Sequence, residues 1–254
     1  MLLAIDIGNT QTAIGLFDGE DLVGDWRTKT IAERTADELA VELTGLFALT
    51  GRGLRDVTQV VLASVVPTAG DALLKMVVRY MKAEALVVGP EIESGLTIEY
   101  HYPENVGADR VANAVAGFHL EGGPLVIVDF GTATTFDVVS DKGAYLGGAI
   151  APGVMTGADA LVRTAVGLHG VSLEAPKRYI GRDTEASLRS GIIFGTAAMV
   201  DGIIAGIKRE VGTVCPVIGT GGLLDLVGLH CRTIDRLEPR LTLYGLKRLW
   251  DLNN

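Results

Sequence analysis

Cysteine is scarce in this sequence, which has only Cys215 and Cys231. These residues lack the Cys-x-x-Cys spacing and the paired histidines of a zinc or redox site. The four histidines are also scattered, without an i, i+4 pair. We therefore expect both thiols to be small reduced side chains of a cytoplasmic protein, and we expect no metal site built on cysteine or histidine.

Long apolar runs and basic clusters are missing as well. The nearest approach to a membrane helix, Ser190 to Val200, has eleven residues, whereas a spanning helix needs about 18. The N-terminus reaches Asp6 without a basic segment before it, unlike a secretory signal. Lysine and arginine total 22 against 31 acidic residues, a net charge of −9, and the densest basic stretch is Lys247-Arg248. The sequence thus predicts neither a membrane partner nor a nucleic-acid partner.

Glycine, in contrast, is abundant, with 33 of 254 residues, nearly twice the usual share of about 7%. No collagen period or low-complexity tract accounts for this excess. The glycines must therefore serve local purposes in a folded chain, such as turns, close backbone approaches and the packing of small residues.

A strand–loop–strand pattern occurs twice, 123 residues apart. The first copy runs from Leu2 to Phe17 and the second from Leu125 to Val139. The aligned pairs are Asp6 with Asp129, Gly8 with Gly131, Thr12 with Thr135, Asp18 with Asp141, and Gly24 with Gly147. Five matches at one offset, in the same order of elements, indicate a duplicated unit.

Strands and helices alternate in both halves of the chain. The elements predicted after the first copy are a helix over 35–49, a strand over 60–66, a helix over 71–82, a strand over 85–88 and a helix up to residue 119. Those predicted after the second copy are helices over 184–210, 223–229 and 243–252 and a strand over 214–218. This order predicts two α/β domains facing each other across a cleft, over residues 1–118 and 119–254.

The two Asp-x-Gly loops combine a carboxylate with backbone N–H groups. Gly8 and Gly131 let the backbone approach an anion closely, and the N–H groups of a tight loop form an anion-binding nest. A carboxylate beside such a nest is suited to a bridging cation. The segment Gly219-Thr220-Gly221-Gly222 ends a strand and precedes a helix, a position typical of nucleotide contact. No Gly-Lys-Ser/Thr occurs in the sequence, which excludes P-loop kinases.

Five motifs appear in an order and at a spacing similar to those of a known family. They are Asp6-Ile7-Gly8-Asn9-Thr10, Gly107-Ala108-Asp109-Arg110, Asp129-Phe130-Gly131-Thr132-Ala133, Gly147-Gly148-Ala149-Ile150-Ala151-Pro152-Gly153 and Thr220-Gly221-Gly222. Together they resemble type III pantothenate kinase, a branch of the acetate and sugar kinase, heat-shock chaperone and actin superfamily. The resemblance covers essentially the whole chain, although the residues that follow Leu161 to Ala165 depart from the family pattern.

The resemblance implies a fold of two duplicated actin-like (ribonuclease H-like) α/β domains facing a nucleotide cleft. It implies ATP-dependent phosphorylation of pantothenate to 4′-phosphopantothenate, the first step of coenzyme A biosynthesis. It also implies magnesium with ATP, a monovalent cation (potassium or ammonium), and a homodimer with the substrate site near its interface.

Roles for individual residues also follow from the resemblance. Asp109 takes the position of the general base, although its place before a helix also fits an N-cap. Asp6 is expected to orient the magnesium of ATP through water, and Asp129 to bind the monovalent cation. The expected ATP contacts are Asp6, Ile7, Gly8, Asn9, Thr10, Gln11, Thr12, Ala13, Thr132, Gly221 and Gly222. The expected pantothenate contacts are Tyr100, Gly107, Ala108, Asp109, Arg110 and Thr184.

Two questions stay open at this point. The first is whether Gly191-x-x-x-Gly195 and Gly202-x-x-x-Gly206 pack against the protein's own sheet or against a second subunit, since small residues at this spacing suit either. The second is whether the chain is a pantothenate kinase, a non-catalytic regulator that resembles one, or another small-alcohol kinase of the superfamily. The retained carboxylates Asp6, Asp109 and Asp129 favour an enzyme.

Overall fold

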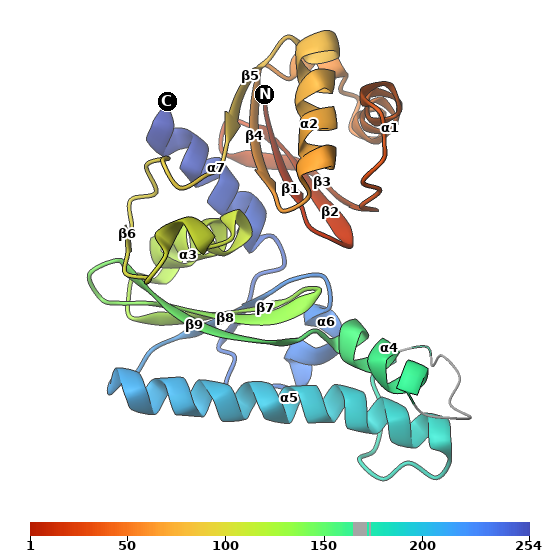
Figure 1. Ribbon diagram of the computed structural model, residues 1–254, viewed down its shortest axis with the longest axis vertical. Coiled ribbons are helices and arrows are strands. Elements are labelled where there is room, and N and C mark those ends of the chain that lie inside the picture. The colour runs from red at the N-terminus through yellow and green to blue at the C-terminus, as the bar shows by residue number, and fades with distance from the viewer. Residues whose placement is uncertain (165–171, 173) are drawn as a thin grey trace. The chain divides into compact units, whose positions relative to one another are not determined.

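The structure of the chain is a computed structural model that describes residues 1–164, 172 and 174–254. The start of the segment that departs from the family pattern, residues 166–171 and 173, lies outside the described residues. The chain forms two compact units (Figure 1). Unit 1 comprises residues 1–96, 100–116 and 241–254, and unit 2 comprises residues 97–99 and 117–240.

Unit 1 is built on a five-stranded sheet with the order β3-β2-β1-β4-β5. Its strands are β1 (Leu2–Ile7), β2 (Gln11–Asp18), β3 (Asp21–Lys29), β4 (Gln59–Ser64) and β5 (Glu84–Val87). The central strand β1 pairs antiparallel with β2 and parallel with β4. Its residues are almost all buried, which explains the continuous apolar run of the sequence, since both faces of this strand are covered.

Helices cover both faces of the unit 1 sheet. On one face, Leu3, Ile5 and Ile7 pack against α1 (Ala36–Ala48) and α2 (Pro67–Met76), which continues as a π-helical turn (Val77–Met81). On the other face, Leu2 and Ala4 pack against α3 (Ala108–Glu121) and α7 (Leu241–Asn253). Asp6 alternates with Ile5 and Ile7 along β1, so its side chain points toward the face of α3 and α7.

The ends of two unit 1 helices follow from their first residues. A capping box begins α1, because Thr35 accepts from the Glu38 N–H and the Glu38 carboxylate accepts from the Thr35 N–H. Helix α2 begins at Pro67, four residues before the expected start at Asp71. Proline is accommodated in the first helical turn, where its missing N–H would have no intrahelical partner.

Unit 2 is built on a six-stranded sheet with the order β11-β10-β7-β8-β9-β6. Its strands are β6 (Thr97–Ile98), β7 (Leu125–Phe130), β8 (Ala133–Val139), β9 (Ala144–Pro152), β10 (Val217–Thr220) and β11 (Arg236–Leu237). One face packs against α4 (Val154–Thr164), α5 (Thr184–Val211) and α6 (Leu224–Val227). On the other face Gly117 of α3 packs closely against Leu125. A Cβ at Gly117 would lie 2.8 Å from Leu125 Cδ1.

The two sheets share one topology. The order β9-β8-β7-β10-β11 of unit 2 repeats β3-β2-β1-β4-β5 of unit 1. Both copies also contain an irregularity at the same place, between Leu16 and Phe17 in β2 and between Val138 and Val139 in β8. Gly24 pairs with Leu16, and Gly147 pairs with Val138. The duplication predicted from the sequence is therefore confirmed in the pairing of the strands.

Two aligned pairs of the predicted repeat are wrong, Thr12 with Thr135 and Asp18 with Asp141. Phe17 pairs with Leu2 and Val139 with Leu125, so Asp18 corresponds to Ser140. Asp6 pairs with Ala13 across the first loop, whereas Asp129 pairs with Thr135 across the second. The second loop is one residue shorter, so Thr135 corresponds to Ala13 and not to Thr12. An offset counted along the sequence does not reveal this difference in turn length.

The expected domain ranges differ from the observed units in one large segment. Helix α7, expected in the C-terminal domain, belongs to unit 1, where Leu246, Leu249 and Trp250 are part of the core. The units change within α3, between Ala116 and Gly117, and the short strand β6 belongs to unit 2.

Helix α5 ends one residue beyond the helix expected over 184–210. Among the described residues it is long and apolar enough to cross a membrane by length and composition. In the structure it packs against the unit 2 sheet (Figure 1). Ile193, Ala197, Val200 and Ile204 face the core, as is typical of a core helix in a globular protein.

Candidate active site

The first Asp-x-Gly loop is a tight turn between β1 and β2. The Gly8 N–H donates a hydrogen bond to the Gln11 carbonyl at 3.1 Å. A Cβ at Gly8 would lie 3.0 Å from that same oxygen, so the turn leaves no room for a side chain. Asn9, Thr10 and Gln11 are exposed at its tip, while Asp6 is half-buried at the strand end. The loop thus presents polar groups to solvent beside a carboxylate.

Thr30, the residue after β3, supports this loop through two hydrogen bonds. Thr12 and Thr30 share a hydrogen bond of 2.9 Å between their hydroxyl groups. The Thr30 N–H donates to the Thr10 carbonyl at 3.0 Å. These contacts fix the loop on the rigid sheet of unit 1, as a site that must hold phosphate groups in place requires.

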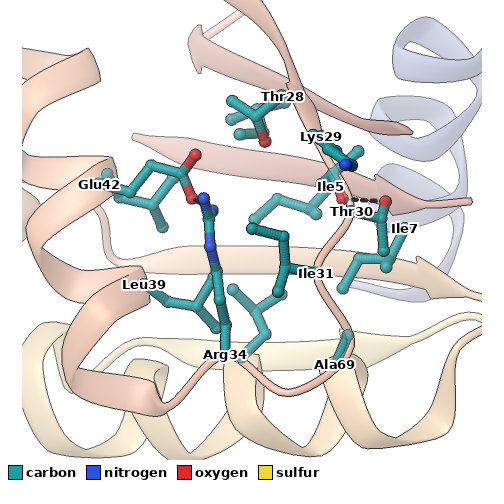
Figure 2. Close-up of a pocket in the computed structure, with 14 residues that line it drawn as sticks. Ile5, Ile7, Thr28, Lys29, Thr30, Ile31, Arg34, Leu39, Glu42 and Ala69 are labelled. Carbon is teal, nitrogen blue, oxygen red and sulfur yellow. Dashed lines mark hydrogen bonds and ion pairs between the residues drawn. The ribbon is translucent and has the colours of Figure 1, made fainter. Parts of the chain in front are cut away.

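A small apolar cavity lies next to this support (Figure 2). Ile5, Ile7 and Leu39 line it, and an ion pair between Arg34 and Glu42 lies at one side. Ile5 and Ile7 belong to the core beneath α1 and α2, whereas Asp6 points to the opposite face of the sheet. The cavity is therefore separate from the carboxylate of the loop.

Asp109 lies in the first turn of α3. The helix begins at Ala108, and the Val111 N–H donates to the Gly107 carbonyl at 3.1 Å. The interpretation of Asp109 as the N-cap is therefore wrong, because Asp109 is already helical. A Cβ at Gly107 would lie 2.4 Å from Asp109 Oδ1, so the carboxylate lies directly over the glycine.

Helix α3 and Asp6 share one face of the unit 1 sheet. Ala112 and Val115 of α3 pack with Leu2 and Ala4 of β1. Asp6 follows Leu2 and Ala4 at a spacing of two residues, so its side chain lies on the same face of the sheet. The next residue along α3, Arg110, is 8% exposed, unusually buried for an arginine. Unit 1 therefore places Asp6, its loop and the first turn of α3 on the same side of one sheet.

The second Asp-x-Gly loop joins β7 and β8 in unit 2. The Gly131 N–H donates to the Ala133 carbonyl at 3.1 Å. The Thr156 hydroxyl of α4 donates to the Thr132 carbonyl at 2.7 Å. A Cβ at Gly153 would lie 2.3 Å from that carbonyl oxygen. The glycine of the Pro152-Gly153 segment thus allows the chain to lie against the loop.

Gly221 lies against Asp129 of the same loop. Its φ is +101°, and a Cβ there would be 2.4 Å from Asp129 Oδ1. The Leu223 N–H donates to the Phe130 carbonyl at 3.2 Å. Gly222 follows in the same turn, and the helix expected over 223–229 forms as α6 (Leu224–Val227) followed by a 3-10 turn (Gly228–His230). The structure brings Asp129, Thr132 and Gly221 together within unit 2.

The remaining expected substrate contacts lie in different units. Tyr100 is 39% exposed and belongs to unit 1, as do Gly107 to Arg110. Thr184 is exposed at the start of α5 in unit 2. There the Asp183 side chain caps the helix by accepting from the Ala186 N–H at 2.7 Å.

A buried polar cluster in unit 2 was not found from the sequence. Asp137 and Tyr145 are both completely buried. The Tyr145 hydroxyl donates to Asp137 Oδ1 at 2.7 Å, and the Thr135 hydroxyl donates to Oδ2 at 3.3 Å. The alternation Thr135-Phe136-Asp137 could have revealed two polar side chains on one face of a strand.

The thiols and carboxylates of the described residues constrain the metal chemistry. No group of three or more histidine, cysteine, aspartate or glutamate side chains is placed to hold a metal ion in the part of the chain that the structure describes. Burial and the charge of Asp201 raise the pKa of the Cys231 thiol to about 12, and burial also raises that of Cys215. Both thiols are therefore protonated at neutral pH, as expected for structural cysteines.

Comparison with solved structures shows an actin-like α/β fold. A Baf family protein described as a transcriptional activator, from Campylobacter jejuni, aligns with a TM-score of 0.61 at 18% identity, over 98% of this chain and 97% of that chain. The inorganic polyphosphate/ATP-glucomannokinase of Arthrobacter sp. strain KM aligns with a TM-score of 0.51 at 14% identity, over 100% and 99%. At these identities the likeness concerns the fold, and it confirms the fold class expected from the sequence.

Comparison with protein sequences is more specific. The family model described as type III pantothenate kinase matches residues 2–206. The type III pantothenate kinase of Anaeromyxobacter sp. (strain K) is 47% identical over 253 residues, and that of Moorella thermoacetica is 45% identical over 253 residues. Each match covers 100% of this chain and 100% of the relative. The chain therefore belongs to the type III pantothenate kinase family.

Proposed function

We propose that the chain transfers the γ-phosphoryl group of ATP to the hydroxyl group of pantothenate, with Asp109 as the general base. The product is 4′-phosphopantothenate, the first intermediate of coenzyme A biosynthesis, and the reaction belongs in the cytoplasm. The observation that carries the proposal is the full-length identity of 45–47% to type III pantothenate kinases. The two Asp-x-Gly loops on a duplicated sheet support it, because they suit the phosphates of a nucleotide.

Each unit has one loop whose groups suit the phosphates of ATP. In unit 1 the Asp6 carboxylate lies at the end of β1, beside backbone groups that the Gly8 turn exposes. In unit 2 Asp129 and Thr132 lie beside Gly221, whose missing side chain lets it pack against Asp129 and Phe130. Carboxylate and backbone groups of this kind fit magnesium-bound phosphates. Magnesium, when bound, neutralises charge on the transferred phosphoryl group, and Asp6 orients it through water.

Asp109 accepts the proton of the substrate hydroxyl. As the hydroxyl oxygen forms its bond to the γ-phosphorus, the bond from phosphorus to the β,γ-bridging oxygen breaks, and ADP leaves with that oxygen. The position of Asp109 at the start of α3, on the Asp6 side of the unit 1 sheet, supports this role. Arg110 follows it in the helix and pairs with the carboxylate of pantothenate or a phosphoryl oxygen. Tyr100, Gly107, Ala108 and Thr184 complete the pantothenate contacts.

A monovalent cation, potassium or ammonium, binds at Asp129. The cation adds positive charge beside the phosphates of ATP. The protein has a net charge of −9, so it must otherwise attract these phosphates through local groups.

The chain forms a homodimer through α5. Between Ser190 and Lys208 the exposed residues of this helix follow a heptad spacing and are small, namely Gly191, Gly195, Ala198, Gly202 and Ala205. A Cβ at Gly191, Gly195 or Gly202 meets no atom of the described residues within 4 Å. These glycines are therefore not needed for packing within the chain, and the exposed face fits the close approach of a second helix. Thr184, at the start of α5, would then reach the substrate of the partner subunit.

The activity is tested with a panel of alcohols. Purified protein is incubated with magnesium and ATP, and with pantothenate, glucose or glycerol as the acceptor, in potassium chloride or choline chloride at equal ionic strength. We expect ADP to form with pantothenate alone, and faster in potassium. Turnover with a sugar but not with pantothenate would assign the chain to another kinase of the superfamily. Nucleotide binding without any turnover would favour a non-catalytic regulator.

A further inference from the structure

Three polar residues form a row across adjacent strands of unit 2. Asp129 on β7 pairs in register with Thr220 on β10 and with Thr135 on β8. Val128 and Phe130, the neighbours of Asp129, point to the opposite face, which packs against α4, α5 and α6. Residues paired in register place their side chains on the same face. The carboxylate therefore lies between two threonine side chains.

The two hydroxyl groups of this row have oxygen lone pairs to offer. Thr220 is completely buried, and its hydroxyl has no hydrogen-bond partner among the described residues. The Thr135 hydroxyl donates its proton to Asp137, which Tyr145 also holds, so the Thr135 oxygen is turned with its lone pairs outward. A buried hydroxyl without a partner is unfavourable, so a partner for Thr220 is to be expected in the working enzyme.

The duplicated unit shows that the fold does not require these hydroxyls. In unit 1, Asp6 pairs in register with Ala63 on β4 and Ala13 on β2. Both alanines are buried, and the sheet has the same strand order. The three corresponding positions are thus alanine, aspartate and alanine in unit 1, and threonine, aspartate and threonine in unit 2. The threonines serve a purpose that belongs to unit 2 alone.

We propose that the hydroxyl oxygens of Thr220 and Thr135 bind, together with the Asp129 carboxylate, one monovalent cation. Asp137 and Tyr145 are positioning residues that orient the Thr135 hydroxyl. This inference rests on the proposed cation at Asp129 and adds the residues that complete the site. One carboxylate with two neutral hydroxyl oxygens carries a single negative charge, which balances one monovalent cation. A side chain at position 221 would displace Asp129 Oδ1, because a Cβ there would lie 2.4 Å from this oxygen.

The test compares two valine variants. Thr220→Val removes the hydroxyl from the row, and Thr134→Val is the matched control. Thr134 is also completely buried and has a hydroxyl without a partner in the described residues, but it alternates with Thr135 and so points to the other face of the sheet. The unfolding temperature of each protein is measured with magnesium and ADP, in potassium chloride and in choline chloride at equal ionic strength.

We expect potassium to raise the unfolding temperature of the wild type and of Thr134→Val. In Thr220→Val the rise should be lost or should require at least about tenfold more potassium, one order of magnitude in affinity. In choline chloride Thr220→Val should be as stable as the wild type or more stable, because it lacks a buried hydroxyl without a partner. Thr135→Ser, which keeps a hydroxyl, should retain the potassium response.

An unchanged potassium response in Thr220→Val would overturn the inference and leave the cation at Asp129 in place. A second arm replaces potassium chloride with magnesium chloride. If this raises the unfolding temperature of the wild type equally, and the rise is lost in Thr220→Val, the preference for a monovalent ion is overturned. A wild type with no potassium response would overturn both the row and the proposed cation at Asp129. If pantothenate is not phosphorylated but the potassium response depends on Thr220, the row stands and the proposed activity fails.

Discussion

At the scale of single residues, two glycines make room for the two carboxylates of greatest interest. A Cβ at Gly107 would lie 2.4 Å from Asp109 Oδ1, and one at Gly221 would lie 2.4 Å from Asp129 Oδ1. Real Cβ atoms do not approach an oxygen so closely, since close-packed atoms repel one another strongly at this separation. Each glycine therefore fixes where its carboxylate can lie, which gives part of the glycine excess a specific purpose.

Gly107→Ala should lower activity while leaving the fold intact. The added methyl group forces the Asp109 carboxylate to rotate away, and misplacement of a catalytic group by about 1 Å costs on the order of 10²-fold in rate. We expect kcat for pantothenate phosphorylation to fall by about 10- to 100-fold, measured as ADP formation under saturating ATP.

Gly45→Ala is the matched control for this change. Gly45 is exposed in α1, and a Cβ there meets no atom of the described residues within 4 Å. Alanine in a helix interior is more favourable than glycine by roughly 0.5–1 kcal/mol, so this variant should be fully active and slightly more stable. Full activity of Gly107→Ala would show that the position of Asp109 does not matter for the rate.

At the scale of elements, α7 is attached to the unit 1 sheet by a charged contact as well as by its apolar face. The Lys247 ammonium donates to Glu20 Oε1 at 2.9 Å and to Asp251 Oδ2 at 2.7 Å. Glu20 lies in the turn between β2 and β3, which joins the two strands at the edge of this sheet. Burial by itself lowers the pKa of Lys247, but the hydrogen bonds to Asp251 and Glu20 outweigh it and raise the pKa above its ordinary value of 10.5.

Lys247→Met should destabilise the protein by roughly 1–2 kcal/mol, because methionine keeps the apolar stem but loses the charged hydrogen bonds. A group whose pKa is raised by folding stabilises the native state fully below its unfolded pKa and loses that contribution as pH rises through the folded value. Urea unfolding should therefore show the difference at pH 7, and the difference should shrink above pH 10.5.

Arg248→Met removes one charge from the same helix and should leave the free energy of unfolding nearly unchanged. Equal stability of Lys247→Met and the wild type at pH 7 would show that the apolar face alone holds α7. A difference that grows at high pH would contradict the sign of the pKa shift.

The elements also show how far the sequence alone reaches. The loops around Asp6 and Asp129 could be predicted because a repeated Asp-x-Gly motif is local and easily recognised. The correspondence of Thr135 with Ala13 could not, since it depends on a turn that is one residue shorter. The place of α7 in unit 1 depends on contacts between residues far apart in the sequence. Asp109 lies in the first turn of α3, less than one turn from the N-cap position. Residue patterns do not determine the start of a helix this finely.

At the scale of the whole molecule, we propose that the exposed face of α5 pairs with that of a second copy of the chain. Glycine and alanine leave this face smooth, and helix α5 also has the length and apolar composition to cross a membrane. In a dimer, the small residues of α5 would contact a second copy of α5. In a membrane, they would contact lipid. The two possibilities differ in the mass of the purified protein in the absence of detergent.

Gly195→Arg should convert a dimer to a monomer. No atom of the described residues lies within 4 Å of the added Cβ, and arginine favours a helix more than glycine does, so the variant should fold. We expect light scattering to give twice the chain mass for the wild type and the single chain mass for Gly195→Arg. The variant should also require more pantothenate for half-maximal rate, because Thr184 would no longer reach a partner subunit.

Val214→Arg is the control for this change, because Val214 is 90% exposed just beyond α5 and outside the row of small residues. This variant should keep the wild-type mass. A dimer that survives in Gly195→Arg would place the interface elsewhere on the molecule. A wild type that aggregates without detergent and becomes monodisperse with it would favour a membrane instead.

The measurement that tests the account most directly is the kinetics of Asp109→Asn, with the affinity for magnesium-ATP measured in parallel. Asparagine preserves the shape of the side chain but cannot accept the hydroxyl proton. We predict that kcat for pantothenate phosphorylation falls by about 10²- to 10⁴-fold, while the Kd for magnesium-ATP changes little. A variant that retains its kcat, or one that loses ATP binding together with activity, would contradict Asp109 as the general base.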